Sequence, residues 1–333
     1  MMKKKGMLAG IDVSATELVV AGVRDGTPLP LAHFANDSSG HKQLIRWLTK
    51  GGRTAQVGLE ATGVYSFDLA LALHRAPRVA VMVINPRVIH DFAKASLQRG
   101  KTDAIDAVVI LEFTTRMPFV PWQPPPPESL ELRLIARRIK ALTKMLSQER
   151  NRLHAATQSA EGSQLVCRDI EVNIRHFERR IAQLSEQAVA VIRQHHYLRE
   201  AFDHLLSVRG IATASATQIL AELTVLPSDM TVRQWVAHAG LDPRPFKSGT
   251  SVNKPARVSK AGNKYLRAAL YMPALVAIQH EPNVRAFYEK LIAGGKKPMQ
   301  ANVAVMRKLL HSIYGMLHTH ADFDGEKFFA MAA

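Results

Sequence analysis

The feature of this sequence that most constrains its fold is a proline-rich break about a third of the way along the chain. Residues 117–129 read MPFVPWQPPPPES and include four consecutive prolines. A proline run cannot join a helix or a sheet interior, and it favours an extended spacer. The hydrophobic pattern also changes at this point. We therefore predict separate folded parts on either side of the break, joined by a linker at residues 121–129.

The part before the break, residues 1–120, alternates between two kinds of hydrophobic spacing. Strand-like runs lie at 7–13, 17–23, 30–36, 55–60 and 78–84. Helix-like spacing is found at 38–49, 65–75, 87–97 and 103–115. Three strands in succession, followed by alternating strands and helices, predict an α/β domain with a mixed sheet and helices on its faces.

The segment after the break has a heptad pattern, which is typical of paired helices. Two stretches with this spacing are separated by QSAEGSQ at 158–164. Residues 130–195 are therefore predicted to form a coiled-coil helical hairpin, which either packs on its own domain or serves as a dimerisation arm. The apolar positions are Ile135, Ile139, Leu142, Leu146, Leu153, Ala156, Ile170, Ile174, Phe177, Ile181, Leu184, Ala188 and Val191.

Residues 196–333 are largely helical in pattern and are predicted to form a further domain. Gly210 and Ile211 separate two helical runs within LLSVRGIATASATQILAEL, at 205–223, in the manner of a helix-hairpin-helix motif. Such a turn can offer backbone N–H groups to a nucleic-acid phosphate, which makes Gly210 a candidate contact. A plain packing corner between two helices explains the same pattern equally well.

Basic residues strongly outnumber acidic ones in this chain. It contains 44 Lys and Arg against 28 Asp and Glu, which gives a formal net charge of +16. This excess indicates a polyanionic partner, with nucleic acid favoured over an anionic membrane surface. The single cysteine, Cys167, excludes an intramolecular disulfide and a multi-cysteine zinc site. No apolar run is long enough to cross a bilayer, so we expect a soluble, intracellular protein.

Four carboxylates are predicted to meet in the first domain. Asp12 lies in one apolar strand and Glu60 ends another, where an unpaired charge would be costly. Asp103 and Asp106 stand three apart at the start of a predicted helix, on one face. Taken separately, Asp103 could be a helix N-cap with Asp106 as the acidic third residue, and the strand acids could be salt-bridge partners. Taken together, four like charges favour a bound divalent cation, Mg²⁺ or Mn²⁺.

The order of these acids resembles that of a known nuclease domain. A strand with Asp12, a turn and a second strand, then Glu60, then Asp103-x-x-Asp106 is similar to the Asp-Glu-Asp-Asp set of RuvC-like (RNase H-like) nucleases. Four sequence segments more specifically resemble segments of the DEDD transposases of the insertion-sequence 110 family: GIDVSATEL, LEATGVY, VINP and KTDAIDA. The resemblance implies that all four acids are catalytic ligands of Mg²⁺, with Mn²⁺ as a substitute.

A second resemblance lies near the C-terminal end. Residues 239–277, AGLDPRPFKSGTSVNKPARVSKAGNKYLRAALYMPALVA, are similar to the C-terminal transposase domain of the same family. The resemblance gives Ser248 the role of a nucleophile that forms a covalent phosphoserine bond with DNA, although alone it would be taken for a turn residue. Residues 243–280 contain no acid, which by itself indicates a phosphate-binding surface. Its basic residues are Arg244, Lys247, Lys254, Arg257, Lys260, Lys264 and Arg267.

The two resemblances together imply a bacterial transposase or recombinase that cuts and rejoins an insertion sequence at a composite site of the acids and Ser248. They further imply a noncoding bridge RNA that pairs with donor and target DNA, a homo-oligomer such as a dimer or tetramer, and a cytoplasmic, nucleoid-associated location. Two alternative functions require fewer catalytic residues. One is a RuvC-like junction resolvase or nuclease that hydrolyses DNA with water, and the other is a non-catalytic nucleic-acid-binding scaffold.

Overall fold

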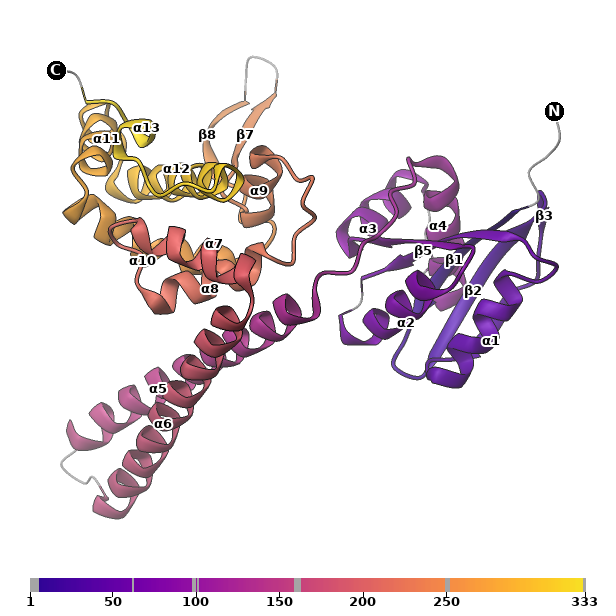
Figure 1. Ribbon diagram of the computed structural model, residues 1–333, viewed down its shortest axis with the longest axis horizontal. Coiled ribbons are helices and arrows are strands. Elements are labelled where there is room, and N and C mark those ends of the chain that lie inside the picture. The colour runs from indigo at the N-terminus through magenta and orange to yellow at the C-terminus, as the bar shows by residue number, and fades with distance from the viewer. Residues whose placement is uncertain are drawn as a thin grey trace. The chain divides into compact units, whose positions relative to one another are not determined.

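The chain is divided into two compact units at its proline run. The computed structural model describes residues 6–61, 63–97, 100, 102–158, 163–248 and 252–331. The units are Met1–Pro124 and Pro125–Ala333, and their boundary falls between two of the consecutive prolines (Figure 1). Among the residues described, no helix is both long enough and apolar enough to cross a membrane.

A mixed β-sheet forms the centre of the first unit. Its order is β3-β2-β1-β5-β6, with β4 also paired to β2. β1 is antiparallel to β2 and parallel to β5, and β5 is parallel to β6. The mixed sheet predicted from the sequence is therefore confirmed. The strands are β1 (Gly6–Val13), β2 (Glu17–Arg24), β3 (Thr27–Pro28), β4 (Ala32–Ala35), β5 (Thr54–Glu60) and β6 (Val79–Ile84).

Helices cover both faces of this sheet, as the sequence predicts. α1 (Ser38–Leu48) and α2 (Val64–Arg75) cover one face (Figure 1). α3 (Pro86–Ala95) and α4 (Asp103–Arg116) cover the other. Successive side chains of a strand point to opposite faces. The odd-numbered residues of β1 enter the core under α1 and α2, and the even-numbered ones face α4.

Two long helices open the second unit. α5 (Pro127–Gln158) and α6 (Gln164–Gln194) lie side by side as a helical hairpin (Figure 1). α5 begins inside the segment expected to be a linker, because proline is tolerated in the first helical turn, where its missing N–H has no partner to lose. Leu132 and Ala136 of α5 and Ala188 of α6 are buried in the core of the second unit. That end of the hairpin therefore packs on its own unit.

Shorter helices and a β-hairpin complete the second unit. One apolar core joins the helices, with Phe202, Leu270 and Leu309 almost fully buried within it. β7 and β8 form a separate antiparallel sheet that follows α9 and precedes α10 (Figure 1). The elements are α7 (His196–Ser207), α8 (Thr213–Leu223), α9 (Val232–Ala239), β7 (Pro243–Ser248), β8 (Val252–Val258), α10 (Lys264–His280), α11 (Pro282–Ala293), α12 (Pro298–Thr319) and α13 (Gly325–Phe328).

Candidate functional site

Asp12 and Glu60 lie near the carboxyl ends of two adjacent parallel strands. The register of β1 and β5 pairs Ile11 with Leu59, which places Asp12 level with Glu60. Ile11 and Leu59 are buried in the core under α1 and α2. Because side chains alternate along a strand, the two acids belong to the opposite face, which α4 covers. The structure thus brings these two predicted site residues together at one edge of the sheet.

Close packing of α4 on the sheet brings two more acids to this edge. A Cβ at Gly10 of β1 would overlap the backbone of Ala107 and Leu111 in α4. A Cβ at Gly58 of β5 would overlap the hydroxyl oxygen of Thr114, further along the same helix. Only glycine permits such an approach, because it has no Cβ. The two glycines therefore allow α4 to lie close against the sheet. The first turn of α4 carries the remaining two predicted acids.

The start of α4 corrects one expectation from the sequence. The N-cap is Thr102, whose side-chain oxygen accepts a hydrogen bond from the N–H of Ile105 at 3.2 Å. The assignment of Asp103 as N-cap, with Asp106 as the third residue, is wrong by one position. Thr102 has the extended backbone that an N-cap requires, and threonine is itself a good cap. The helix is thus capped without using the carboxylate of either acid.

The pKa of Asp12 shows that the four acids influence one another. Burial, with the charges of Asp103, Asp106 and Glu60, raises the pKa of Asp12 from 3.8 to about 6. A backbone hydrogen bond at Val13 acts in the opposite direction but does not offset these effects. Electrostatic influence falls off within about 10 Å at moderate salt. The four carboxylates therefore share one electrostatic environment.

The donor chemistry of this environment fits a hard divalent cation. Carboxylate oxygens are the ligands that Mg²⁺ and Mn²⁺ prefer, and a cation would relieve the repulsion felt by Asp12. Within the described residues, no group of three or more His, Cys, Asp or Glu side chains is already spaced to hold a metal ion. The four carboxylates are near enough to influence one another, but their side chains do not converge on one point. Asp103 is exposed and Asp106 is half-buried, so both side chains have room to rotate.

Ser248 lies in the second unit, at the end of β7. Its backbone pairs with that of Val252 at the start of β8. The side chain of Ser248 lies outside the described part of the chain, as do residues 249–251. Because the acids and Ser248 belong to different units, the composite site implied by the family resemblance stays a prediction.

Basic side chains surround the hairpin that carries Ser248. Arg244 of β7 stands opposite Arg257 of β8, and both are exposed. Lys260 and Lys264, which follow the hairpin, are exposed as well. Arg267 differs, because its guanidinium donates a hydrogen bond of 2.8 Å to the carbonyl oxygen of the last residue in α9. The side chains of two further predicted contacts lie outside the described residues: Lys247 and Lys254.

Gly210 has a packing role in the turn between α7 and α8. Its φ is +112°, and a Cβ there would come within 2.7 Å of the carbonyl oxygen of Pro273 and 2.8 Å of the nitrogen of Ala277. Glycine is therefore needed for this turn to approach α10. The packing corner accounts for the residue, and contact with a nucleic-acid phosphate stays a prediction.

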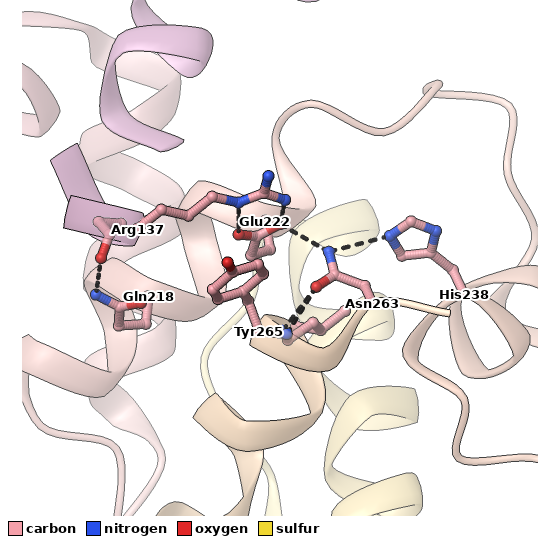
Figure 2. Close-up of polar contacts among 8 residues, drawn as sticks. Arg137, Gln218, Glu222, His238, Asn263 and Tyr265 are labelled. Carbon is pink, nitrogen blue, oxygen red and sulfur yellow. Dashed lines mark hydrogen bonds and ion pairs between the residues drawn. The ribbon is translucent and has the colours of Figure 1, made fainter. Parts of the chain in front are cut away.

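A polar network centred on one buried carboxylate lies at the base of the β7–β8 hairpin (Figure 2). Arg137 of α5 donates two hydrogen bonds of 2.8 Å to the carboxylate of Glu222 in α8. Asn263, the N-cap of α10, donates to the same carboxylate at 2.6 Å. The amide nitrogen of Asn263 also lies 3.3 Å from the ring nitrogen Nε2 of His238 in α9. The network therefore connects the helical hairpin to both ends of the segment that contains β7 and β8.

Glu222 is the centre of this network, and it is not among the site residues predicted from the sequence. Burial alone would raise the pKa of Glu222, but the hydrogen bonds from Arg137 and Asn263 hold it below its usual value. The Glu222 side chain is only 2% exposed, so these partners are essential to keep its charge. A signal was present in the sequence, because Glu222 is the one acid within the largely apolar run QILAELTVL at 218–226.

Comparison with known proteins gives matches to transposases in both units of the chain. Residues 9–160 match the DEDD model of the IS110 transposases, and residues 203–289 match the transposase model of the IS116/IS110/IS902 family. The chain is 29% identical to the pilin gene-inverting protein of Moraxella bovis over 296 residues, which covers 87% of this chain and 89% of that protein. The protein of the same name from Moraxella lacunata gives the same identity and coverage.

A shorter match is to a protein of the insertion element IS110. An uncharacterized 43.6 kDa protein of the insertion element IS110 from Streptomyces coelicolor is 27% identical over 113 residues, or 34% of this chain and 28% of that protein. Two models of one transposase family thus match separate segments, and relatives align across most of the length. The protein belongs to the IS110 family of transposases.

Proposed function

We propose that this protein is a DNA transposase or recombinase of an insertion sequence, which cleaves and exchanges strands through a covalent phosphoserine intermediate. The observation that carries the proposal is the placement of Asp12 and Glu60 at the ends of two adjacent strands, under the helix whose first turn bears the other two acids. The raised pKa of Asp12 agrees with this placement. Four acids gathered at the end of a sheet are the donor set that divalent-metal phosphoryl transfer uses. The family to which the chain belongs is generally dependent on divalent metal ions.

The acids and the serine have separate parts in the proposed reaction. Mg²⁺ would be held by Asp12, Glu60, Asp103 and Asp106, and it would supply neutralisation of charge on the phosphate and on the departing oxygen. The Oγ of Ser248 loses its proton and attacks phosphorus, so that an O–P bond to the serine forms as the P–O bond to one sugar breaks. The released sugar oxygen takes up a proton. Attack by a sugar hydroxyl of another strand then reverses these steps, joins the new strand and frees the serine.

Nucleic acids are the proposed partners of the basic surface. Arg244, Arg257, Lys260 and Lys264 are exposed on or beside the hairpin that ends at Ser248, where they can contact phosphates. We further propose that donor and target DNA are selected by pairing with a bridge RNA, and that the protein acts as a homo-oligomer. The formal charge of +16 supports a polyanionic partner, although it does not favour RNA over DNA.

The covalent step is tested by replacing Ser248 with alanine. Ser248→Ala should abolish recombination in a two-plasmid assay and should abolish the protein–DNA adduct seen on a denaturing gel. Ser251→Ala, three residues further along the sequence, is the matched control and should retain the adduct. Hydrolysis of DNA that continues in Ser248→Ala at the wild-type rate would instead support a nuclease that uses water.

The metal-binding acids need their own test. Asp103→Asn removes one negative charge with almost no change in shape, and it should reduce recombination by at least 10²-fold when one essential metal ligand is lost. Binding of DNA by this variant should stay close to that of the wild-type protein. Undiminished recombination in Asp103→Asn would contradict catalysis at these acids and would favour the scaffold alternative.

The RNA partner is tested by co-purification. The protein is expressed from its native flanking DNA, purified, and any bound RNA is sequenced. A specific short transcript encoded by that flank is the expected result. Recovery of unrelated cellular RNA in proportion to its abundance would contradict guidance by a dedicated RNA.

A further inference from the structure

A cavity on the second unit is lined by other residues than the four acids and Ser248. It has a volume of about 740 Å³ and is formed along α12, with walls from α11 and from the segment that leads into α13. Small-molecule sites in proteins have volumes of about 300–1,000 Å³. None of its lining residues belongs to β7 or β8. The cavity is therefore large enough for a ligand and is not used by the reaction proposed above.

Both acids of this cavity have partners, whereas the basic residues that α12 contributes have no carboxylate partner among the described residues. Asp322 is paired with the ring nitrogen Nδ1 of His204 at 2.7 Å. Asp324 caps α13, accepting backbone hydrogen bonds at 2.9 and 3.2 Å. Lys327 of α13 also lines the cavity and is paired with Asp324 at 3.8 Å. Three basic lining residues of α12 have no carboxylate partner within the described part of the chain: Arg307, Lys308 and His311.

The charges of Arg307 and Lys308 are close enough to His311 to oppose its protonation. Burial, and then the charges of Arg307 and Lys308, lower the pKa of His311. Burial, and then the charge of Lys290, lower the pKa of Lys308. The ammonium of Lys308 lies 4.3 Å from the ring centre of Phe287, so an aromatic face stands where a carboxylate partner would otherwise be. An anionic ligand would relieve this repulsion.

The rest of the lining is suited to a flat apolar group. Phe287, Met316 and Phe323 contribute aromatic and thioether surface to the cavity. Gly315 lines it from the interior of α12, a helix of 22 residues. Glycine in a helix interior is about 1 kcal/mol less favourable than alanine, and a Cβ at Gly315 would have no atom within 4 Å. The absence of a side chain at this position keeps part of the cavity open.

We propose that this cavity binds one nucleotide, with the phosphate beside Arg307 and His311 and the base against Phe287, Phe323 and Met316. An anion joined to a flat ring is the ligand that matches both halves of the lining, and aromatic side chains bind unstacked bases in this way. The nucleotide can be free or can be one unit of a single strand turned out of its stack. The second source rests on the proposed function, since it requires nucleic acid on the protein.

The test is photocrosslinking of the full-length protein in EDTA, where no strand cleavage is needed. The probes are single-stranded DNA and RNA 20-mers with one 4-thiothymidine or 4-thiouridine, and cross-linked peptides are mapped by mass spectrometry. We expect labelling in α12 or at 321–327. Gly315→Leu, which fills the cavity, and Arg307→Gln, which removes a phosphate partner, should each reduce this labelling about tenfold.

Two matched variants control for unrelated effects. Gly315→Ala adds only a methyl group in open space, and Lys296→Gln removes an exposed charge outside the cavity; both should keep wild-type labelling. Labelling that is absent from these peptides, or that survives both Gly315→Leu and Arg307→Gln, would overturn the proposal. An unchanged circular dichroism spectrum of Gly315→Leu would show that its helices are intact. If the spectrum changes, Arg307→Gln still tests the cavity independently.

Competition separates the two sources of the nucleotide. Loss of labelling on addition of the four 5′-mononucleotides would identify a site for free nucleotides. Labelling that resists mononucleotides but yields to an unlabelled 20-mer would identify a nucleotide within a strand. Inorganic phosphate that competes as well as mononucleotides do would reduce the cavity to an anion site and overturn recognition of the base. Repeating the labelling in Ser248→Ala separates this result from the proposed covalent reaction, which that variant cannot perform.

Discussion

Replacing Asp12 with asparagine should make the metal-free protein more stable while removing its activity. Asp12 is partly buried at the end of β1, and burial, with the charges of Asp103, Asp106 and Glu60, raises its pKa to about 6. A raised pKa means that the ionised carboxylate is less stable in the folded protein than in the unfolded chain. Asparagine has the same shape and no charge, so Asp12→Asn removes this cost.

The size of the effect follows from the pKa shift. A rise from 3.8 to about 6 corresponds to roughly 3 kcal/mol at 1.36 kcal/mol per pH unit, which is an upper limit. Asp12 is only partly buried, and solvent screening reduces the contribution. We therefore expect Asp12→Asn to raise the free energy of unfolding of the first unit by about 1–2 kcal/mol at pH 7.5 in EDTA.

The dependence on pH has a definite sign. Between pH 3.8 and about 6 the folded protein holds a proton on Asp12 that the unfolded chain has already lost, so wild-type stability falls as the pH rises through this window. The advantage of Asp12→Asn should be complete above pH 6 and should shrink steadily toward pH 3.8. The opposite trend would require a carboxylate that is stabilised, rather than destabilised, by its surroundings.

Hydrogen exchange measured on peptides from β1, β5 and α4 gives the free energy of opening for this unit alone. Mg²⁺ should reverse the order of the two proteins, because a ligand present at about 100 times its dissociation constant adds about 2.7 kcal/mol to a protein that binds it. Asp91→Asn is the matched control, since that carboxylate is 63% exposed, and it should change stability by less than about 0.5 kcal/mol. If Asp12→Asn is no more stable than the wild-type protein in EDTA at pH 7.5, the inferred crowding of charge is incorrect.

Three further predictions concern packing and charge. Arg137→Met should destabilise the second unit by about 2–3 kcal/mol in urea unfolding, because it leaves the Glu222 carboxylate buried without its main partner, and adding Glu222→Leu should restore most of the loss. Gly10→Ala should destabilise the first unit by about 1–3 kcal/mol through overlap with α4, and native stability in that variant would contradict the close approach. Nucleic-acid affinity should fall roughly 10³–10⁵-fold between 50 and 200 mM salt if 6–10 phosphates are contacted, and Arg244→Gln with Arg257→Gln should make this dependence shallower, whereas a flat response would exclude a phosphate-binding surface.

The strands and helices of the first unit were predictable in their order because its strands are short, apolar and clearly separated. Alternation along β1 and β5 places Asp12 and Glu60 on one face once the strands are known to be parallel neighbours. The helix beginning at Asp103 was predictable as well, but its N-cap was not. Both Thr102 and Asp103 are good cap residues, and a choice between neighbours depends on backbone geometry that composition does not reveal.

Contacts between distant segments were beyond prediction from hydrophobic spacing. Arg137 and Glu222 are 85 positions apart, and nothing local to either residue indicates the other. Gly10 and Gly58 were similarly invisible as a pair, because their shared role appears only when α4 crosses both strands. Periodicity identifies which side of an element is buried, whereas the partner on that side depends on the topology of the whole unit.

The charges of the four acids oppose a closer approach of their side chains. α4 is held by its buried middle, at Ala107, Ile110 and Thr114, so its backbone has little freedom to move the first turn. The repulsion between carboxylates grows as their separation falls. Closing the acids without a cation would therefore raise the pKa of Asp12 above its already elevated value. With a rigid backbone and rotatable, mutually repelling side chains, the proposed divalent cation would draw the acids inward without refolding the unit.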